Sequence, residues 1–466
     1  MSIPILSIAQ MRQWEQATWA AGVSEQEVIR KAGRSVARIA VRNTQPADRI
    51  LILAGKGHNG DDARCTVEWM PDREIRVLDI ADPAQSFENL EACLQRQPDW
   101  IVDGLFGIGL NRPLNEAWIQ FIERVNRSGI PVLSVDVPSG LDADHGKPLG
   151  TAIRAVVTVT LGAPKEGLLM PEAEPYVGRL EVGTDIGLVP CPIENERQWT
   201  VPGDFAGYPP RRLPVTHKGT YGHVAILAGS LGYHGAAVLA ARGALRAQPG
   251  LVTVYPMENV YQPVASQLQA AMVHPWHPHQ ILPDSVTTVL IGPGLADPKT
   301  AERLAQEAAR LWQDSSWHVI VDASALDWLP CGSVPKDVLR CITPHPGEAA
   351  RMLKIPVRAV QADRVGSLRR LSQLWGNCWV VLKGHHTLIG RSTGPLFVNS
   401  SGNPGLAQGG SGDVLAGFIG GLLAQPALTQ APDRALRYAV WRHGDRADSL
   451  QSQASRWTLD ELLAIL

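Results

Sequence analysis

A glycine-rich turn that leads into an acidic residue offers the most definite chemistry in the sequence. Residues 409–412 read Gly-Gly-Ser-Gly, and Asp413 follows them directly. Because glycines leave backbone N–H groups uncovered, this turn and the helix expected after it form an anion site suited to a phosphate chain. The Asp413 carboxylate either caps that helix or acts as a base for a hydroxyl beside the bound phosphates. The turn alone leaves both interpretations open.

Further motifs in the C-terminal half stand where predicted strands end. Residues 343–348 read Thr-Pro-His-Pro-Gly-Glu, and residues 383–387 read Lys-Gly-His-His-Thr. Residues 235–237 (Gly-Ala-Ala) and 292–294 (Gly-Pro-Gly) add two glycine-containing bends. Open α/β sheets bind ligands in loops at the carboxyl ends of their strands. These motifs are therefore expected to gather around the same ligand as Asp413.

Three strand ends in the N-terminal half carry candidate ligands of a second site. The first runs through residues 55–63, Gly-Lys-Gly-His-Asn-Gly-Asp-Asp-Ala, and the others begin at Asp103 and at Asp136. Asn59, Asp103 and Ser139 offer oxygen ligands from loops on one sheet edge, as a hard cation such as potassium requires. Taken singly, each residue type is more common in turns and helix caps.

Strands and helices must alternate to place these motifs, and the sequence predicts that they do. In the N-terminal half the expected strands are 49–55, 74–80, 99–107, 130–137 and 155–162, and the expected helices are 8–21, 25–42, 62–70, 84–97 and 114–128. In the C-terminal half the strands are 223–228, 251–255, 286–291, 318–321, 338–342 and 379–382, with helices up to 247 and at 298–312, 358–375, 414–425, 433–450 and 458–465. This alternation is typical of parallel α/β sheets.

Size and composition favour a soluble protein of two domains. A chain of 466 residues exceeds one ordinary core, and the proline-rich stretch 190–215 reads as a linker. We therefore expect domains at 1–205 and 206–466. The net charge of −2 excludes a basic surface for nucleic acid, and no apolar run reaches the length of a membrane span. Six cysteines without metal or disulfide spacing suit a cytoplasmic protein.

The C-terminal motifs together resemble the ribokinase-like ADP/ATP-dependent NAD(P)H-hydrate dehydratases over most of residues 213–466. The resemblance rests on five motifs in the family's order, which begin at Gly235, Gly292, Thr343, Lys383 and Asn403. It implies that Asp413 is catalytic and that residues of the later motifs bind the nucleotide, namely Lys383, Gly384, His385, His386, Thr387 and Gly412. It also implies a hydrate site formed by Ala236, Gly294, His345 and Asp413. Glu348 could orient magnesium through water or simply begin a helix.

The N-terminal motifs resemble the NAD(P)H-hydrate epimerases over about residues 8–200. The resemblance implies potassium ligands at Asn59, Asp103 and Ser139, and a role for Asp136 either in acid–base chemistry or in substrate contact. Further substrate contacts are implied at His58, Asn59, Gly60, Asp61, Asp62, Gly107, Ile108, Gly109, Leu110, Asn111, Arg112 and Pro113. The family turn usually reads Asn-Asn-Gly-Gly-Asp-Gly, whereas this chain has His58, Asp61 and Ala63 at three of those positions. An added carboxylate near a dinucleotide phosphate is unfavourable unless Asp61 points away or His58 is protonated.

These resemblances predict an N-terminal Rossmann-like three-layer domain and a C-terminal ribokinase-like domain that together repair nicotinamide nucleotides. One domain interconverts the R and S forms of hydrated NADH or NADPH, and the other dehydrates the S form with ADP or ATP, Mg²⁺ and K⁺ as cofactors. In the dehydration, Asp413 takes the hydroxyl proton as the oxygen attacks the terminal phosphate, and elimination of phosphate follows. The family also implies a homo-oligomer.

An alternative is a ribokinase-like small-molecule kinase with a catalytically silent N-terminal nucleotide-binding module. Residues 345–348 favour the dehydratase, while the altered turn at His58, Asp61 and Ala63 is the only support for a silent module. A purely structural role for the second domain fits poorly with glycines, Lys383 and Asp413 at its strand ends. The sequence does not choose between ADP and ATP, or between the two hydrates.

Overall fold

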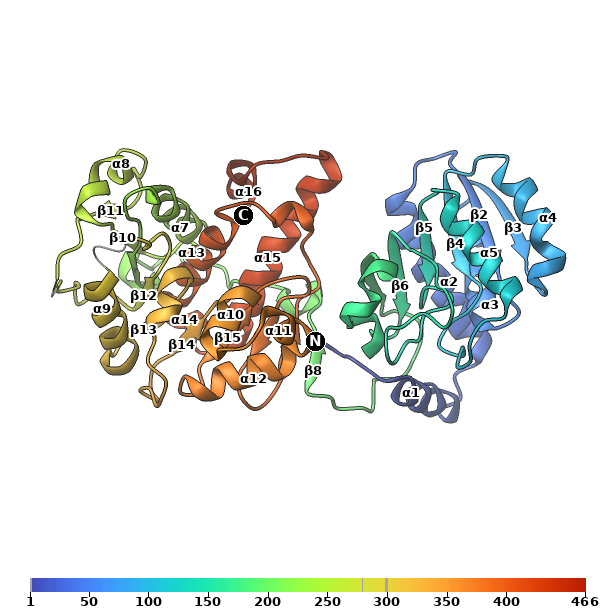
Figure 1. Ribbon diagram of the computed structural model, residues 1–466, viewed down its shortest axis with the longest axis horizontal. Coiled ribbons are helices and arrows are strands. Elements are labelled where there is room, and N and C mark those ends of the chain that lie inside the picture. The colour runs from blue at the N-terminus through green and yellow to red at the C-terminus, as the bar shows by residue number, and fades with distance from the viewer. Residues whose placement is uncertain (1, 279, 298–300) are drawn as a thin grey trace. The chain divides into compact units, whose positions relative to one another are not determined.

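The computed structural model describes residues 2–278, 280–297 and 301–466. The chain forms two compact units, one of residues 3–196 and one of residues 197–466 together with Ser2. Figure 1 draws the smaller unit in blue to green and the larger in green to red. No helix in the described part of the chain is long and apolar enough to cross a membrane.

The smaller unit is built on a six-stranded parallel sheet in the order β3-β2-β4-β5-β6-β7. In chain order its strands are β2 (Arg49–Ala54), β3 (Glu74–Asp79), β4 (Trp100–Gly104), β5 (Val132–Val135), β6 (Val157–Leu161) and β7 (Arg179–Gly183). Its helices are α1 (Ile8–Ala20), α2 (Glu25–Asn43), α3 (His58–Cys65), α4 (Pro83–Leu94), α5 (Glu116–Arg127) and α6 (Glu174–Val177). Strand β7 at one edge was not expected from the sequence.

Helices cover both faces of this sheet. Successive residues of β2 face opposite sides, so Ile52 packs in a cluster with Val36 of α2, whereas Leu53 packs in another cluster with Phe121 of α5. A strand that is buried on both faces must be apolar at almost every position, as β2 is after Arg49. The predicted three-layer α/β architecture is thereby confirmed.

The larger unit also contains a mainly parallel sheet, in the order β8-β17-β16-β15-β14-β13-β12-β9-β10-β11. In chain order the strands are β8 (Arg197–Trp199), β9 (His223–Leu227), β10 (Leu251–Tyr255), β11 (Met272–Val273), β12 (Thr288–Ile291), β13 (His318–Val321), β14 (Arg340–Ile342), β15 (Trp379–Leu382), β16 (Leu388–Gly390) and β17 (Leu396–Val398). Among the described strands, only β16 pairs antiparallel with both of its neighbours. The parallel section therefore directs its strand ends to one edge.

The helices of this unit lie on both sides of the sheet (Figure 1). They are α7 (His234–Arg246), α8 (Tyr261–Ala265), α9 (Ala301–Asp314), α10 (Pro346–Leu353), α11 (Val357–Ala362), α12 (Arg364–Leu374), α13 (Ser411–Leu423), α14 (Pro426–Thr429), α15 (Pro432–Gln453) and α16 (Leu459–Ile465). Of the helix expected at 298–312, residues 298–300 lie outside the described residues. Helices α7, α13 and α15 share one core with β9, β12 and β13.

Helices α7 and α13 meet backbone to backbone, and this contact fixes the position of Asp413. A Cβ atom on Gly417 of α13 would lie 1.9 Å from the carbonyl oxygen of Ala240, and one on Gly243 of α7 would lie 2.2 Å from that of Val414. Only glycine allows so close an approach. The small residues in the sequence of α13 thus serve helix packing at the site.

Two sequence expectations differ from the observed elements. The single helix expected at 358–375 is wrong, because Asp363 leaves the helical conformation between α11 and α12 and its side chain caps Gly366. The proline-rich stretch 190–215 contains strand β8, which pairs in parallel with β17. Three residues of that stretch therefore belong to a sheet, since their pairing partner comes from a distant part of the chain.

Candidate active sites

The start of helix α13 forms one candidate site, in the larger unit. Gly410 precedes the helix with a φ of +99°, a conformation that favours glycine. Asp413 lies in the first turn of α13, as expected from the sequence. The backbone N–H groups of such a turn point toward an anion without help from side chains. Phosphate groups bound here would lie beside the Asp413 carboxyl.

A buried charge cluster adjoins this helix start. The Lys383 Nζ atom lies 2.7 Å from Asp322 Oδ1 and 3.8 Å from Glu348 Oε2. Asp322 is only 2% exposed and also accepts a hydrogen bond of 2.7 Å from Thr343 Oγ1. Asp322, Thr343 and Lys383 each directly or closely follow a strand of the parallel section, β13, β14 and β15. The sheet edge thus brings together residues that are far apart in the sequence.

The cluster sets the proton affinities at the site. Burial, reinforced by the charges of Asp322 and Glu348, raises the pKa of Asp413 to about 7, although Lys383 opposes the shift. Burial would lower the pKa of Lys383, but the charges of Asp322 and Glu348 raise it. Lys383 therefore stays an ammonium ion, while Asp413 can gain or lose a proton near neutral pH, as a general base must.

His345 and Glu348 form the N-terminal cap of α10. The His345 backbone N–H donates to Glu348 Oε2 at 2.7 Å, and His345 Nδ1 accepts from the Gly347 N–H at 3.0 Å. The structure thus gives Glu348 a helix-starting role and also places its carboxylate near Lys383. The His345 side chain is half exposed and remains accessible to a ligand.

The remaining predicted residues of this unit lie in tight bends. Gly294 has a φ of +65°, and a Cβ atom there would lie 2.8 Å from the Cβ of Ala236, so these two bends touch. After Lys383 the chain turns sharply, with Thr387 Oγ1 donating to the Gly384 carbonyl at 3.0 Å. The His386 ring is buried, which lowers its pKa to about 3, and it is therefore neutral.

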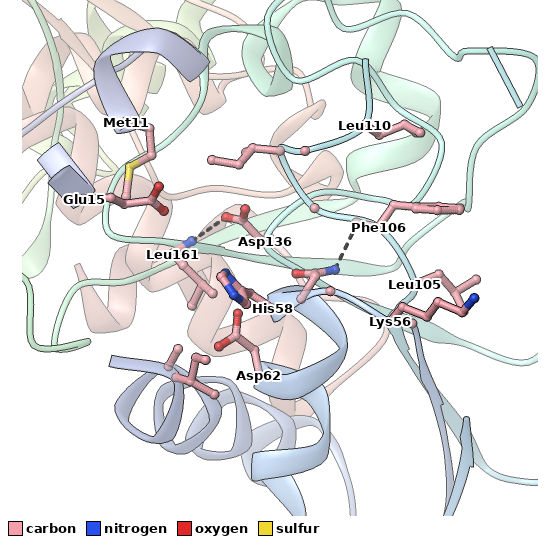
Figure 2. Close-up of a pocket in the computed structure, with 18 of the residues that line it drawn as sticks. Met11, Glu15, Lys56, His58, Asp62, Leu105, Phe106, Leu110, Asp136 and Leu161 are labelled. Carbon is pink, nitrogen blue, oxygen red and sulfur yellow. Dashed lines mark hydrogen bonds between the residues drawn. The ribbon is translucent and has the colours of Figure 1, made fainter. Parts of the chain in front are cut away.

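The second candidate site is a cavity of about 680 Å³ in the smaller unit (Figure 2). Most of the residues predicted to bind substrate line it, namely His58, Asn59, Asp62, Gly107, Ile108, Gly109, Leu110, Asn111, Arg112 and Asp136. Gly60, Asp61 and Pro113 are not among the lining residues. Glu15 of α1 and Lys165, which sequence reasoning did not select, do line it.

Asp136 is held in a strained position at the wall of this cavity. Its φ is +63°, in the left-handed region that non-glycine residues rarely adopt. Its Oδ1 atom accepts from the Leu161 N–H at 3.0 Å, from Thr160 Oγ1 at 3.3 Å and from Lys165 Nζ at 2.5 Å. Backbone strain of this kind persists at functional sites when surrounding contacts enforce it. The three donors supply that enforcement.

The extra carboxylate in the turn at residues 58–63 is neutralised from outside the cavity. Arg64 Nη1 lies 2.8 Å from Asp61 Oδ1, and the same guanidinium contacts Asp79 and the Gly55 carbonyl. Asp61 therefore points toward Arg64. His58 faces Glu25 of α2, with His58 Nε2 3.4 Å from Glu25 Oε1. This departure from the family turn thus adds no uncompensated charge to the cavity.

Asn59, Asp103 and Ser139 lie together, as the potassium hypothesis requires. Asp103 is fully buried and accepts from both the N–H and the Oγ of Ser139. Asn59 Nδ2 donates to the Phe106 carbonyl at 2.9 Å, a bond drawn in Figure 2. In the described chain the buried Asn59 Oδ1 has no hydrogen-bond partner. An unpaired buried oxygen is costly, and a cation would satisfy it.

Comparisons with known proteins identify the family. The family model for NAD(P)H-hydrate dehydratase matches residues 224–466, and that for YjeF-related protein N-terminus matches residues 75–167. The bifunctional NAD(P)H-hydrate repair enzyme Nnr of Gloeobacter violaceus is 35% identical to the chain, over 99% of the chain and 96% of that protein. The enzyme of the same description from Escherichia coli is 32% identical, over 93% and 86%.

The chain belongs to the bifunctional NAD(P)H-hydrate repair enzymes. This membership confirms the expected family and supports hydrate repair over the alternative of a small-molecule kinase.

One solved structure supports the fold of the larger unit, and a second is similar in sequence. A ribokinase-like superfamily protein of Enterococcus faecalis has a TM-score of 0.51 and 25% identity, over 58% of this chain and 94% of that one. This likeness confirms the predicted ribokinase-like fold. An ADP/ATP-dependent NAD(P)H-hydrate dehydratase of Bacillus subtilis, co-crystallised with ATP and Mg²⁺, has a TM-score of 0.48 and 32% identity, over 55% and 91%.

Besides Glu15, sequence reasoning missed two residues of the candidate sites, Asp322 and Lys165. Asp322 directly follows the correctly predicted strand at 318–321, so the rule that ligands gather at strand ends could have found it. Lys165 follows the strand expected at 155–162 by three residues. Both residues were passed over because no glycine-rich motif surrounds them.

Proposed function

We propose that the larger unit dehydrates the S form of hydrated NADH or NADPH with Asp413 as the general base. The observation that carries this proposal is the partly buried Asp413 carboxyl, with a pKa of about 7, at a glycine-rich helix start beside the Lys383 ammonium. In the proposed reaction Asp413 takes the proton of the substrate hydroxyl as its oxygen attacks the terminal phosphorus of ADP or ATP. The backbone N–H groups of residues 409–412 stabilise charge on the transferred group.

The second half of the reaction needs little from the protein. Once phosphorylated, the oxygen leaves as phosphate and the carbon–oxygen bond breaks. The neighbouring carbon gives a proton to water, and the electrons of that carbon–hydrogen bond form the restored double bond. The lone pair of the ring nitrogen assists departure of the phosphate. Residues 383–387 are proposed to hold the nucleotide, and Ala236, Gly294 and His345 to hold the nicotinamide end.

Magnesium fits this site chiefly as a partner of the nucleotide. The described residues contain no group of three or more histidine, cysteine or acidic side chains arranged for a metal. Mg²⁺ commonly binds through substrate phosphates, waters and one or two carboxylates, and Glu348 and Asp413 are the candidates here. When bound, the ion would neutralise phosphate charge. Lys383 already occupies the space between Asp322 and Glu348.

The pH dependence of dehydration should report the Asp413 carboxyl. Because a base acts only when ionised, kcat/KM should increase about ten-fold from pH 6 to pH 8, with its midpoint near the Asp413 pKa of about 7. Initial rates of absorbance recovery with the S hydrate would measure this. The residual rate of Asp413→Asn should lack the same rise. An unchanged kcat/KM across this range would contradict the assignment.

For the smaller unit we propose epimerisation of the hydrated carbon, with Asp136 in an acid–base role and potassium held by Asn59, Asp103 and Ser139. The support for potassium is the buried, unpartnered Asn59 Oδ1 close to the Asp103–Ser139 pair. When bound, K⁺ would fix the loops at the cavity wall and compensate the buried Asp103 charge. Asp62, His58 and residues 107–112 are proposed to contact the substrate.

Potassium should activate epimerisation through Asn59. Replacing K⁺ by Li⁺ is expected to slow epimerisation. Asn59→Ala should raise the K⁺ concentration for half-maximal activity at least about ten-fold, because even the loss of a residue that only supports a metal's ligands lowers metal affinity about 10–100-fold. K⁺ should also raise the melting temperature of the wild-type smaller unit but not that of the variant. Asn43→Ala, which changes an asparagine at the end of α2, is the matched control. Equal K⁺ responses in both variants would contradict the ligand set.

The domain bounds, the cellular location and the oligomeric state of the enzyme are also proposed. We propose that residues 1–205 and 206–466 are the functional domains, that the enzyme works in the cytoplasm, and that it forms homo-oligomers. A net charge of −2 and the absence of a basic cluster from the sequence support a small-molecule substrate without nucleic acid as a partner.

The decisive experiment follows nicotinamide absorbance in a mixture of both NADH-hydrate epimers with ATP or ADP, Mg²⁺ and K⁺. Wild-type enzyme should restore the whole mixture. Asp136→Ala should promptly form NADH only from the S epimer, once the spontaneous interconversion of the epimers has been subtracted. Recovery that stops after one epimer in wild-type enzyme would contradict epimerisation. The absence of recovery from folded protein with either nucleotide would contradict dehydration.

A further inference from the structure

The cavity of the smaller unit contains two carboxyl groups in opposite environments. Asp136 is paired with the ammonium of Lys165, a side chain that is only 1% exposed. Lys165 also donates to Thr160 Oγ1 at 3.0 Å and to the Leu161 carbonyl at 2.8 Å. The lysine is therefore held rigidly, and it compensates the negative charge of Asp136 inside the protein.

Asp62 lies across the same cavity without such compensation. It belongs to α3, is 8% exposed and lines the cavity (Figure 2). In the part of the chain that the structure describes, its carboxyl has no hydrogen-bond or ion-pair partner. Burial, together with the charges of Asp136 and Asp61, raises the pKa of Asp62 well above its ordinary value. Burial without a cationic partner favours the protonated form of such a carboxyl, which is the form that can donate a proton.

The charged groups around Asp62 come from several elements. Asp136 and Lys165 follow strands β5 and β6, Asp61 neighbours Asp62 on α3, and Glu15 faces it from α1. Glu15 also has a raised pKa, chiefly through burial, but Lys165, His58 and Arg12 oppose that shift. Glu15 is only partly buried. Asp62 is therefore the better-shielded carboxyl and Glu15 the natural comparison.

Asp136 keeps one oxygen available for substrate. All three of its hydrogen-bond donors, from residues 160, 161 and 165, contact Oδ1. Among the described residues no donor contacts Oδ2. Oδ1 is thus used for positioning, whereas Oδ2 can accept a proton.

We propose that Asp62 is the proton donor and Asp136 the proton acceptor of epimerisation, and that Lys165 is the positioning residue that fixes Asp136 for this role. This inference rests on the epimerase activity proposed above. Two carboxyl groups whose environments differ in this way are the usual basis for dividing acid and base roles. The division also explains why a lysine is buried at the cavity wall.

The proposed step balances as follows. Asp62 gives its proton to the hydroxyl oxygen on the hydrated carbon, the carbon–oxygen bond breaks, and the ring nitrogen lone pair forms a carbon–nitrogen double bond. Water leaves. A water on the opposite face then adds to the same carbon while Asp136 Oδ2 takes its proton, and the electron pair returns to nitrogen. Proton exchange with solvent restores both carboxyl groups. No oxidation or reduction occurs.

The first test compares full-length Asp62→Asn and Glu15→Gln with wild type, using NADH-hydrate enriched in the R epimer with ATP, Mg²⁺ and K⁺. Asp62→Asn should lower kcat for epimerisation at least about 100-fold, the scale of a lost general acid. Glu15→Gln should lower it less than about ten-fold. NADH formation from the S epimer needs dehydration alone, so its rate shows whether the larger unit of each variant is still active. A kcat for Asp62→Asn within ten-fold of wild type would overturn the proposal.

The second test separates positioning from folding at Lys165. Lys165→Met should lower kcat for epimerisation with little change in KM, and Lys165→Arg should recover part of the loss, because a cation is again available to Asp136. Wild-type kcat/KM for epimerisation should fall as pH rises through the raised pKa of Asp62, because the proton donor is then lost. This decline should be absent from Asp62→Asn. If it persists there with the same midpoint, another group donates the proton.

The third test needs no variant and keeps the proposal testable if Lys165→Met does not fold. In water enriched in ¹⁸O, every R molecule that is epimerised by carbon–oxygen cleavage acquires a solvent oxygen. Dehydration then passes that oxygen to the released phosphate. Phosphate formed from the R epimer should carry ¹⁸O, whereas phosphate formed early from the S epimer should not. Unlabelled phosphate from both epimers would overturn the proposed cleavage. Failure of wild-type enzyme to consume the R epimer would instead contradict the epimerase function itself.

Discussion

Replacing Asp413 by asparagine should lower kcat for dehydration of the S hydrate by about a thousand-fold. The amide has the shape of the carboxyl but cannot take the substrate proton, and lost general-base catalysis costs about 10²–10⁴-fold. KM for the nucleotide should change little, because the backbone N–H groups of residues 409–412 remain. Single-turnover recovery of nicotinamide absorbance, with the S epimer and saturating ATP, would measure the chemical step.

The matched control for this variant is Asp433→Asn. Asp433 also lies in the first turn of a helix, α15, where a carboxylate stabilises the helix by about 0.3–1 kcal/mol. Its replacement should therefore cost about 0.3–1 kcal/mol of stability without a comparable loss of dehydration. If both variants retained more than a tenth of wild-type activity, Asp413 would be a helix-starting residue and not the base. Epimerisation should continue in both variants.

The position of Asp413 was predictable because local sequence determines it. A glycine-rich turn, an acidic residue and an apolar helix of small residues follow one another without interruption, and α13 begins at Ser411, three residues before the expected start at 414. The alternation of strands and helices was predictable for the same reason, because the spacing of apolar residues within about ten positions indicates the type of each element. The residues that gather at the strand ends follow from the parallel topology.

Contacts between distant segments were not predictable in the same way. Strand β8 forms because Arg197–Trp199 pairs with β17, which lies about 200 residues later in the chain. The sequence raised Asp61 as an unfavourable charge, and only the fold shows Arg64 between Asp61 and Asp79. Whether a charge is compensated depends on which loops meet, and no local pattern carries that information.

The two candidate sites use the same electrostatic arrangement in different folds. In each unit a lysine pairs with one buried aspartate, Lys165 with Asp136 and Lys383 with Asp322. A second carboxyl nearby, Asp62 or Asp413, has a raised pKa. The lysine allows one carboxylate to stay charged in a buried place, and that charge in turn raises the proton affinity of its neighbour. Both lysines therefore act on chemistry that takes place at another residue.

Replacing Lys383 by methionine should strongly destabilise the larger unit. Methionine keeps the length of the side chain, but Asp322 and Glu348 would lose the ammonium within 4 Å of their carboxylates. Removal of one partner from a buried ion pair costs about 3–5 kcal/mol, because the other charge remains buried without compensation. Denaturant unfolding should show this decrease in the free energy of unfolding, and dehydration should be lost with it.

The loss should depend on pH in a definite direction. Without Lys383 the negative charges of Asp322 and Glu348 stay buried without a cation, so the folded state is favoured at low pH, where carboxyl groups are neutral, and loses stability as pH rises. The variant should therefore be closer to wild type at pH 5 than at pH 8.

A second change, Asp322→Asn, removes the uncompensated charge but preserves the acceptor for Thr343, and it should restore much of the stability without restoring dehydration. Recovery of stability without activity would separate the two roles of Lys383. If the single variant were as stable as wild type at pH 8, the buried carboxylates would have found water or another cation, and the cluster would not depend on this lysine.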